Sequence, residues 1–332
     1  MIPVLLVLVA LQAPPQAPAA SSLPPELTAI RSQIMEGRAD AALEQLARMP
    51  PDGPYVRYLT GLAYYHRDDH VRAIERLASV AHVLPEGSPE RREAVQVLGL
   101  SYYLASRLRE ALPLLEETRQ WARDNSELGH VLGLVYIQTQ QPDKARTVIA
   151  ETFGVEPSSA AAHLYTAQLM IRVEFHEAAG VELTRALALD PRVPQAHALL
   201  GQLAVYRARL DEAVALFRKA IEISPLDAMA HYRLGEAYAR QQKWDDAIAT
   251  LQRSLWINPY YSGPYIVLGR AYMTKGQPST AEGLLRRAVE YDPNNKSAHY
   301  LLGQALQKLG READAAREFD IAASLSDSQQ QR

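Results

Sequence analysis

The chain of 332 residues contains no cysteine. Disulfide bonds, thiolate catalysis and cysteine-ligated metal sites are therefore excluded. A lipid anchor of the bacterial kind is also excluded, because it is attached to a cysteine. A strong charge of either sign is absent as well, since the formal net charge is −3 and both signs are dispersed along the chain. A nucleic-acid groove needs a basic stripe, so we expect no nucleic-acid partner.

The sequence is also short of membrane-spanning runs. The apolar run Ile2–Leu11 is about ten residues long, against the roughly 20 that cross a bilayer, so no stable membrane span is expected. With the small residues Ala17 and Ala19 after it, the run predicts a signal peptide over residues 1–19, a linker over 20–23, and a periplasmic or secreted protein. No lysine or arginine precedes the run, so the alternative is a proline-rich tail on a cytoplasmic protein.

Small residues and prolines recur with a common period along the rest of the chain. The alanine series begins with steps of 31 and 38, the glycine series with a step of 38 and the proline series with a step of 72, after which every step is 34 residues. The first series is Ala42, Ala73, Ala111, Ala145, Ala179, Ala213, Ala247, Ala281 and Ala315. The second is Gly61, Gly99, Gly133, Ala167, Gly201, Gly235, Gly269 and Gly303, and the prolines are Pro85, Pro157, Pro191, Pro225, Pro259 and Pro293. A period of this length indicates stacked helix–turn–helix units.

The clearest unit covers residues 262–295, in which Gly269 and Ala281 let two helices approach each other closely. Gly276 suits the turn between these helices, and Pro293 ends the unit. The step of 38 places extra residues near Ser88-Pro89, a side-chain cap followed by proline. It predicts a longer first helix in the third unit.

These residues resemble the tetratricopeptide repeat, in the order Tyr265, Leu268, Gly269, Tyr272, Ala281, Leu285 and Pro293. The resemblance implies an all-α, right-handed α-solenoid of about nine repeats over residues 24–326, with a disordered tail at 327–332. It also implies that the first helices line a concave groove that binds a protein or peptide partner.

The repeat register assigns residues to this groove. They are Tyr58, Leu62, Tyr65, Leu100, Tyr103, Leu134, Ile137, Arg172, Tyr206, Tyr232, Arg240 and Arg270. The first seven are aromatic or aliphatic, whereas the others bring arginine and tyrosine, the residue types that dominate binding hot spots. One variant of the family binds a C-terminal carboxylate with lysine and asparagine. No asparagine occupies the corresponding position here, so we expect no such clamp. The residues at this position are Leu62, Leu100, Leu134, Gln168, Gln202, Glu236, Arg270 and Gln304.

Histidines raise the question of a metal. His163, His197, His231 and His299 share one repeat position, but stacked helices lie about 8–10 Å apart, too far for neighbours to share an ion. We therefore assign them to packing. His66 and His70 flank the expected turn near Asp68 and would not share a helix face.

Catalytic motifs are missing too, since we find no phosphate loop, nucleophile elbow or supported carboxylate pair. We expect no enzyme and no cofactor. The preferred interpretation is a non-catalytic scaffold that holds partner segments and supports assembly of an envelope complex. The alternatives are a self-associating array whose homo-oligomer is the functional form, and a ligand or metal site that uses His66 and His70 or the inner tyrosines.

Overall fold

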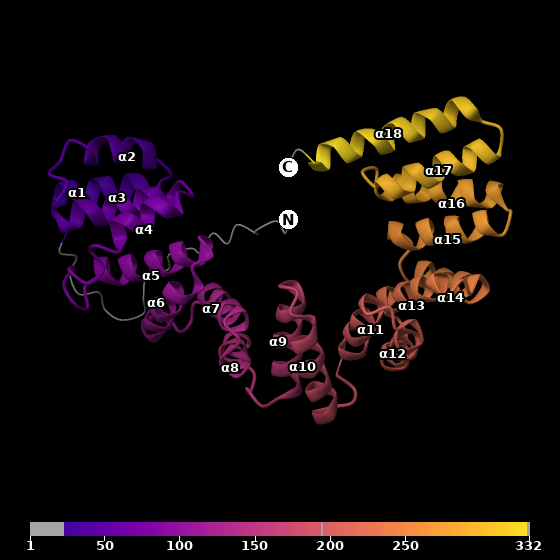
Figure 1. The fold of residues 1–332 in the computed structure, drawn as a ribbon, viewed down its shortest axis with the longest axis horizontal. Coiled ribbons are helices and arrows are strands. Elements are labelled where there is room, and N and C mark those ends of the chain that lie inside the picture. Colours follow the sequence, from indigo (N-terminus) through magenta and orange to yellow (C-terminus); the bar gives the residue numbers. More distant parts are fainter. Residues whose placement is uncertain (1–22, 194, 331–332) are drawn as a thin grey trace. The chain divides into compact units, whose positions relative to one another are not determined.

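The computed structural model describes residues 23–193 and 195–330. The expected signal peptide at 1–19 and most of the linker at 20–23 lie outside these residues. Within them the chain forms eighteen helices and no strand. Consecutive helices form pairs (Figure 1), which confirms the all-α tetratricopeptide-type solenoid.

The chain divides into two compact units, Met1–Glu182 and Leu183–Arg332, with the boundary inside α10. The first unit contains α1 (Pro25–Met35), α2 (Ala39–Leu46), α3 (Pro54–His66), α4 (His70–Leu77), α5 (Pro89–Leu104), α6 (Leu108–Trp121), α7 (Ser126–Gln138), α8 (Pro142–Phe153), α9 (Ala160–Arg172) and the start of α10 (His176–Leu189). The second contains α11 (Ala196–Tyr206), α12 (Leu210–Ile223), α13 (Ala228–Arg240), α14 (Trp244–Ile257), α15 (Ser262–Thr274), α16 (Pro278–Tyr291), α17 (Lys296–Lys308) and α18 (Glu312–Gln330).

Polar side chains start many of the first helices. Asn125, Asp227 and Asn295 each accept a hydrogen bond from a backbone N–H in the first turn of α7, α13 and α17. Ser88 caps α5 in the same way and Pro89 follows it. As a result α5 has 16 residues where α7 has 13, which confirms the longer first helix in the third repeat.

Each first helix ends at a residue in the left-handed region, with φ between 57° and 81°. These residues are Gly37, Asp68, Ser106, Gln140, Glu174, Ala208, Gln242, Gly276 and Gly310. The next N–H reaches back to close the helix, as from Lys243 N to Tyr238 O at 3.0 Å, the pattern of a Schellman turn. The turn expected at Gly276 is therefore confirmed, and six repeats make the same turn without glycine.

The small residues of the first helices lie where the paired helix approaches. A Cβ atom added at Gly235 would lie 2.6 Å from Leu251 Cγ, and one at Gly269 would lie 2.6 Å from Leu285 Cγ. Leu251 and Leu285 are fully buried. Each glycine therefore leaves space for a leucine of the second helix. This leucine follows the small residue of the second helix, Ala247 or Ala281, by one turn.

The C-terminal end differs from expectation. Helix α18 runs to Gln330, four residues into the segment expected to be disordered. After Gly310 the sequence has no proline or glycine to stop the helix. Among the described helices, none combines the length and apolarity needed to cross a membrane.

The close approach at Gly235 predicts opposite effects for two glycine-to-alanine changes. Gly235→Ala places a methyl group against buried Leu251 and should lower the free energy of unfolding by about 1–3 kcal/mol. Gly283, exposed on α16 with no atom within 4 Å of an added Cβ, is the matched control. Gly283→Ala should raise stability by about 0.5–1 kcal/mol. Urea denaturation followed by circular dichroism measures both, and a neutral Gly235→Ala would contradict the packing.

The turn at Ala208 predicts a second pair of opposite effects. Ala208 has a φ of 57°, which is costly for a residue with a Cβ atom. Ala208→Gly should therefore stabilise the protein by about 0.5–1 kcal/mol. Ala215→Gly, on the exposed face of α12, should destabilise it by about 1 kcal/mol. Thermal unfolding of the two variants distinguishes them, and equal losses would show that the turn is not strained.

Candidate functional site

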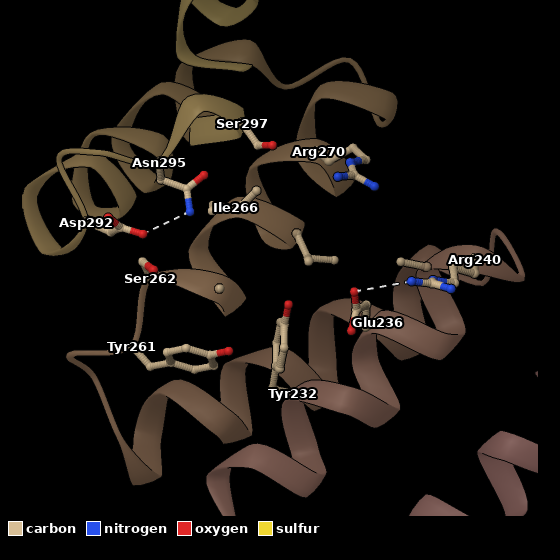
Figure 2. Close-up of a pocket in the computed structure, with 13 residues that line it drawn as sticks. Tyr232, Glu236, Arg240, Tyr261, Ser262, Ile266, Arg270, Asp292, Asn295 and Ser297 are labelled. Carbon is tan, nitrogen blue, oxygen red and sulfur yellow. Dashed lines mark hydrogen bonds and ion pairs between the residues drawn. The ribbon is translucent and has the colours of Figure 1, made fainter. Parts of the chain in front are cut away.

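A hollow of about 500 Å³ opens on the first helices of the second unit. It lies between α13 and α15, and the start of α17 closes one side (Figure 2). Three residues assigned to the groove from the sequence meet here, namely Tyr232, Arg240 and Arg270. The lining also includes Glu236, Ala239, Tyr261, Ser262, Gly263, Ile266, Val267, Asp292, Asn295 and Ser297.

Two tyrosines form one wall of this hollow. The rings of Tyr232 and Tyr261 meet edge to face, with centroids 5.2 Å apart. Gly263 makes this arrangement possible, because a Cβ atom there would lie 3.1 Å from the Cζ atoms of both rings. Burial raises the pKa of Tyr232 to about 12, and the Glu236 carboxylate adds to this rise. The Tyr232 hydroxyl is therefore protonated at neutral pH and can donate a hydrogen bond to a ligand.

Charged side chains lie along α13. Glu236 pairs with Arg233 at 3.1 Å and with Arg240 at 3.6 Å. Because one carboxylate faces two guanidinium groups, this trio keeps a net positive charge. Arg270 extends from the neighbouring helix α15 toward the same side of the hollow in Figure 2. The wall of tyrosines thus adjoins a cationic side.

A smaller hollow of about 280 Å³ adjoins the first and shares Glu236 and Arg240 with it. Gln202 and Tyr206 of α11 line it. The Tyr206 side chain is 71% exposed. All four groove residues expected in the second unit therefore line one of these two adjoining hollows.

In the first unit, only part of the expected groove surface is accessible. Tyr65, Tyr103 and Leu134 are half-buried and Arg172 is exposed. The other four expected residues are core residues, and their assignment to an accessible surface is wrong for the structure described. These are Tyr58 and Leu62 at 0% exposure and Leu100 and Ile137 at 2%.

The reason is lateral packing between neighbouring first helices. Helix α3 lies against both α1 and α5, so side chains on its flanks are covered from two sides. The Tyr58 hydroxyl donates to Glu93 of α5, which also accepts two hydrogen bonds from Arg31 of α1 at 2.8 and 3.0 Å. This partly buried network joins the first three repeats and removes Tyr58 from the surface.

The repeated histidines hold consecutive repeats together. His197, His231 and His299 each place Nε2 about 3 Å from the carbonyl oxygen of the proline that ends the preceding repeat. Tyr265, at the same repeat position, donates its hydroxyl to Pro259 at 3.0 Å. His163 instead places Nδ1 2.7 Å from Glu182. These contacts give the histidines the packing role inferred from the sequence.

His66 and His70 lie on different helices, at the end of α3 and the start of α4, with Asp68 in the left-handed turn between them. Burial lowers the pKa of both rings. Across the described part of the chain, no three histidine, aspartate or glutamate side chains come close enough to hold a metal ion.

The register missed Tyr261, Asn295 and Ser297, because it assigned the groove to the bodies of the first helices. These residues lie in or beside the links that follow α14 and α16. Two signals were present in the sequence. Gly263 is a glycine at a repeat position where Met229 and Ser297 have side chains, and it follows a pair of tyrosines.

Family comparison agrees with this architecture. A tetratricopeptide repeat model matches residues 37–89, 174–228, 198–262 and 266–329, and a second tetratricopeptide repeat model matches 102–169. The chain therefore belongs to the tetratricopeptide repeat family. Proteins of this family are generally non-catalytic scaffolds with extended binding surfaces, and the chain is accordingly a protein-interaction scaffold.

Several solved structures are similar in fold. MamA from Desulfovibrio magneticus RS-1 is 24% identical with a TM-score of 0.47, and the match covers 51% of this chain and 96% of that one. YrrB, described as a TPR protein with an unusual peptide-binding site, is 22% identical with a TM-score of 0.45, over 55% and 93% of the chains. The Cut9–Hcn1 structure matches at 18% identity and a TM-score of 0.46, over 83% and 53%. Among curated proteins, none matches the chain.

Proposed function

We propose that the chain is a non-catalytic scaffold that holds an extended segment of a partner protein on the first helices of its second unit. The observation that carries this proposal is the hollow between α13, α15 and α17, where a tyrosine wall adjoins two arginines. Tyrosine and arginine are enriched among the few residues that dominate the binding energy of protein interfaces, because they combine large contact area with directed hydrogen bonds.

The shape of the surface favours an extended segment over a small molecule. The two hollows share Glu236 and Arg240, so they lie next to each other on a path along α11, α13 and α15. A peptide main chain can follow such a path while successive side chains enter it. The partly accessible residues of the first unit, Tyr65, Tyr103 and Arg172, offer a further contact surface of similar chemistry.

Site-specific photocrosslinking in the native cell tests this proposal. A benzoylphenylalanine at Tyr261 faces the hollow, whereas one at Glu290 is exposed on α16 and serves as the control. We expect a defined protein product from position 261 alone, and its loss when Tyr232→Ala and Arg240→Ala are added. Identical products from both positions, or crosslinks only between copies of this chain, would refute the groove and favour the self-associating form.

We further propose that the scaffold serves an envelope complex outside the cytoplasm. The support is the sequence of residues 1–19, an apolar run followed by a small-x-small site. Residues 1–23 fused to a phosphatase that is active only after export should give activity in a bacterial host. Leu6→Arg/Leu8→Arg interrupts the run and should abolish the activity. An inactive parent fusion would instead place the scaffold in the cytoplasm.

A further inference from the structure

The charges around the main hollow are unevenly distributed. In Figure 2, Arg240 and Arg270 lie on one side, and Asp292 and Asn295 lie on the opposite side. Asn295 caps α17 through its side-chain oxygen and donates its Nδ2 to Asp292 at 3.0 Å. Asp292 is thereby held on the polar side, away from the arginines. The hollow thus has a cationic side and a polar side.

Arg270 is the distinctive group on the cationic side. Within residues 23–193 and 195–330 its guanidinium makes no ion pair or hydrogen bond, and the side chain is exposed. Its equivalents in the neighbouring repeats are Gln202, Glu236 and Gln304, none of which is cationic. Its charge is therefore left for a ligand, and a guanidinium can bind a carboxylate through two parallel hydrogen bonds.

Arg240 reinforces this preference. Its partner Glu236 is already held at 3.1 Å by Arg233, while Arg240 lies at 3.6 Å. A second carboxylate that enters between Arg240 and Arg270 would meet two cations and one shared anion. An ammonium or a second guanidinium would meet net repulsion there. Electrostatic complementarity of this kind determines which partners bind.

We propose that this hollow selects an internal aspartate or glutamate of the bound segment. Its carboxylate pairs with the guanidinium of Arg270, and Arg240 adds a second positive charge. An adjacent aromatic or aliphatic side chain packs against Tyr232 and Tyr261. The inference rests on the proposed binding of an extended segment and names the residue that this segment must carry. The acid is a side chain because the asparagine position of the family's C-terminal carboxylate clamp is occupied here by Glu236 and Arg270.

Selection from a displayed random 12-residue library, with the peptide C-terminus fused to its carrier, tests the preference. The full chain is compared with Arg270→Gln and with the control Arg287→Gln. Arg287 is exposed on α16, where it pairs with Glu290 at 3.0 Å outside the hollow. We expect wild type and the control to enrich an acidic residue beside an aromatic or aliphatic one. With Arg270→Gln the acidic preference should disappear while the apolar preference remains.

Affinities of a synthetic peptide from the wild-type selection give the second readout. Replacing its acidic residue by glutamine should weaken binding about tenfold or more to wild type and change little with Arg270→Gln. The effect should shrink as salt rises, because the site is open to solvent. A phosphoserine version that binds more than tenfold tighter than the acidic one would overturn the carboxylate assignment in favour of phosphate.

The remaining outcomes separate this inference from the proposed function. If wild type enriches peptides without an acidic residue, or if Arg270→Gln keeps the acidic preference, the inference is wrong and the groove stands. If peptides that need a free C-terminal carboxylate bind better than the fused form, the internal acid is wrong. If wild type enriches no peptide at all, the groove does not hold extended segments and both proposals fail.

Discussion

The structure depends on how closely the two helices of each repeat approach. At Gly235 and Gly269 the first helix carries no Cβ, and a buried leucine of the second helix occupies that space. A helix pair of this kind cannot bury its apolar face alone, so it stacks on the next pair. From Gly99 and Ala111 onward the small residues recur every 34 positions, so the close approach of the two helices recurs from repeat to repeat.

This local and periodic constraint explains what the sequence could predict. Helix pairs, the turn at Gly276 and the long α5 all follow from residues close together in the chain, and all are present. The accessible surface is not a local property. Tyr58 and Leu62 occupy the same repeat positions as Tyr232 and Glu236, yet they are fully buried. Helix α13 lies between α11 and α15 as α3 lies between α1 and α5, so the difference comes from side chains of the neighbouring repeats, such as Glu93 and Arg31 beside Tyr58. No register within one repeat contains that information.

The candidate site was predictable to a similar extent. Tyr232, Arg240 and Arg270 follow from the register because they lie on the bodies of first helices. Tyr261 and Asn295 belong to links, whose side-chain directions depend on backbone turns rather than on helical period. Asn295 is still readable as a helix cap, but its second bond to Asp292 requires the fold. Periodic reasoning therefore identifies the lining residues that lie on the first helices and misses those that lie in the links between helices.

Specificity can arise on this frame because the backbone repeats while the side chains vary. One position reads Gln202, Glu236, Arg270 and Gln304 on consecutive first helices of the second unit. If every repeat carried arginine there, like charges would repel and no site would differ from the next. Arg270, which has no ion-pair partner among the described residues, lies beside a partly neutralised trio and so distinguishes one place along the path. In the proposed complex, the register of a bound segment would be set by where its acid meets Arg270, and the hydrophobic contacts with Tyr232 and Tyr261 would supply affinity without fixing position.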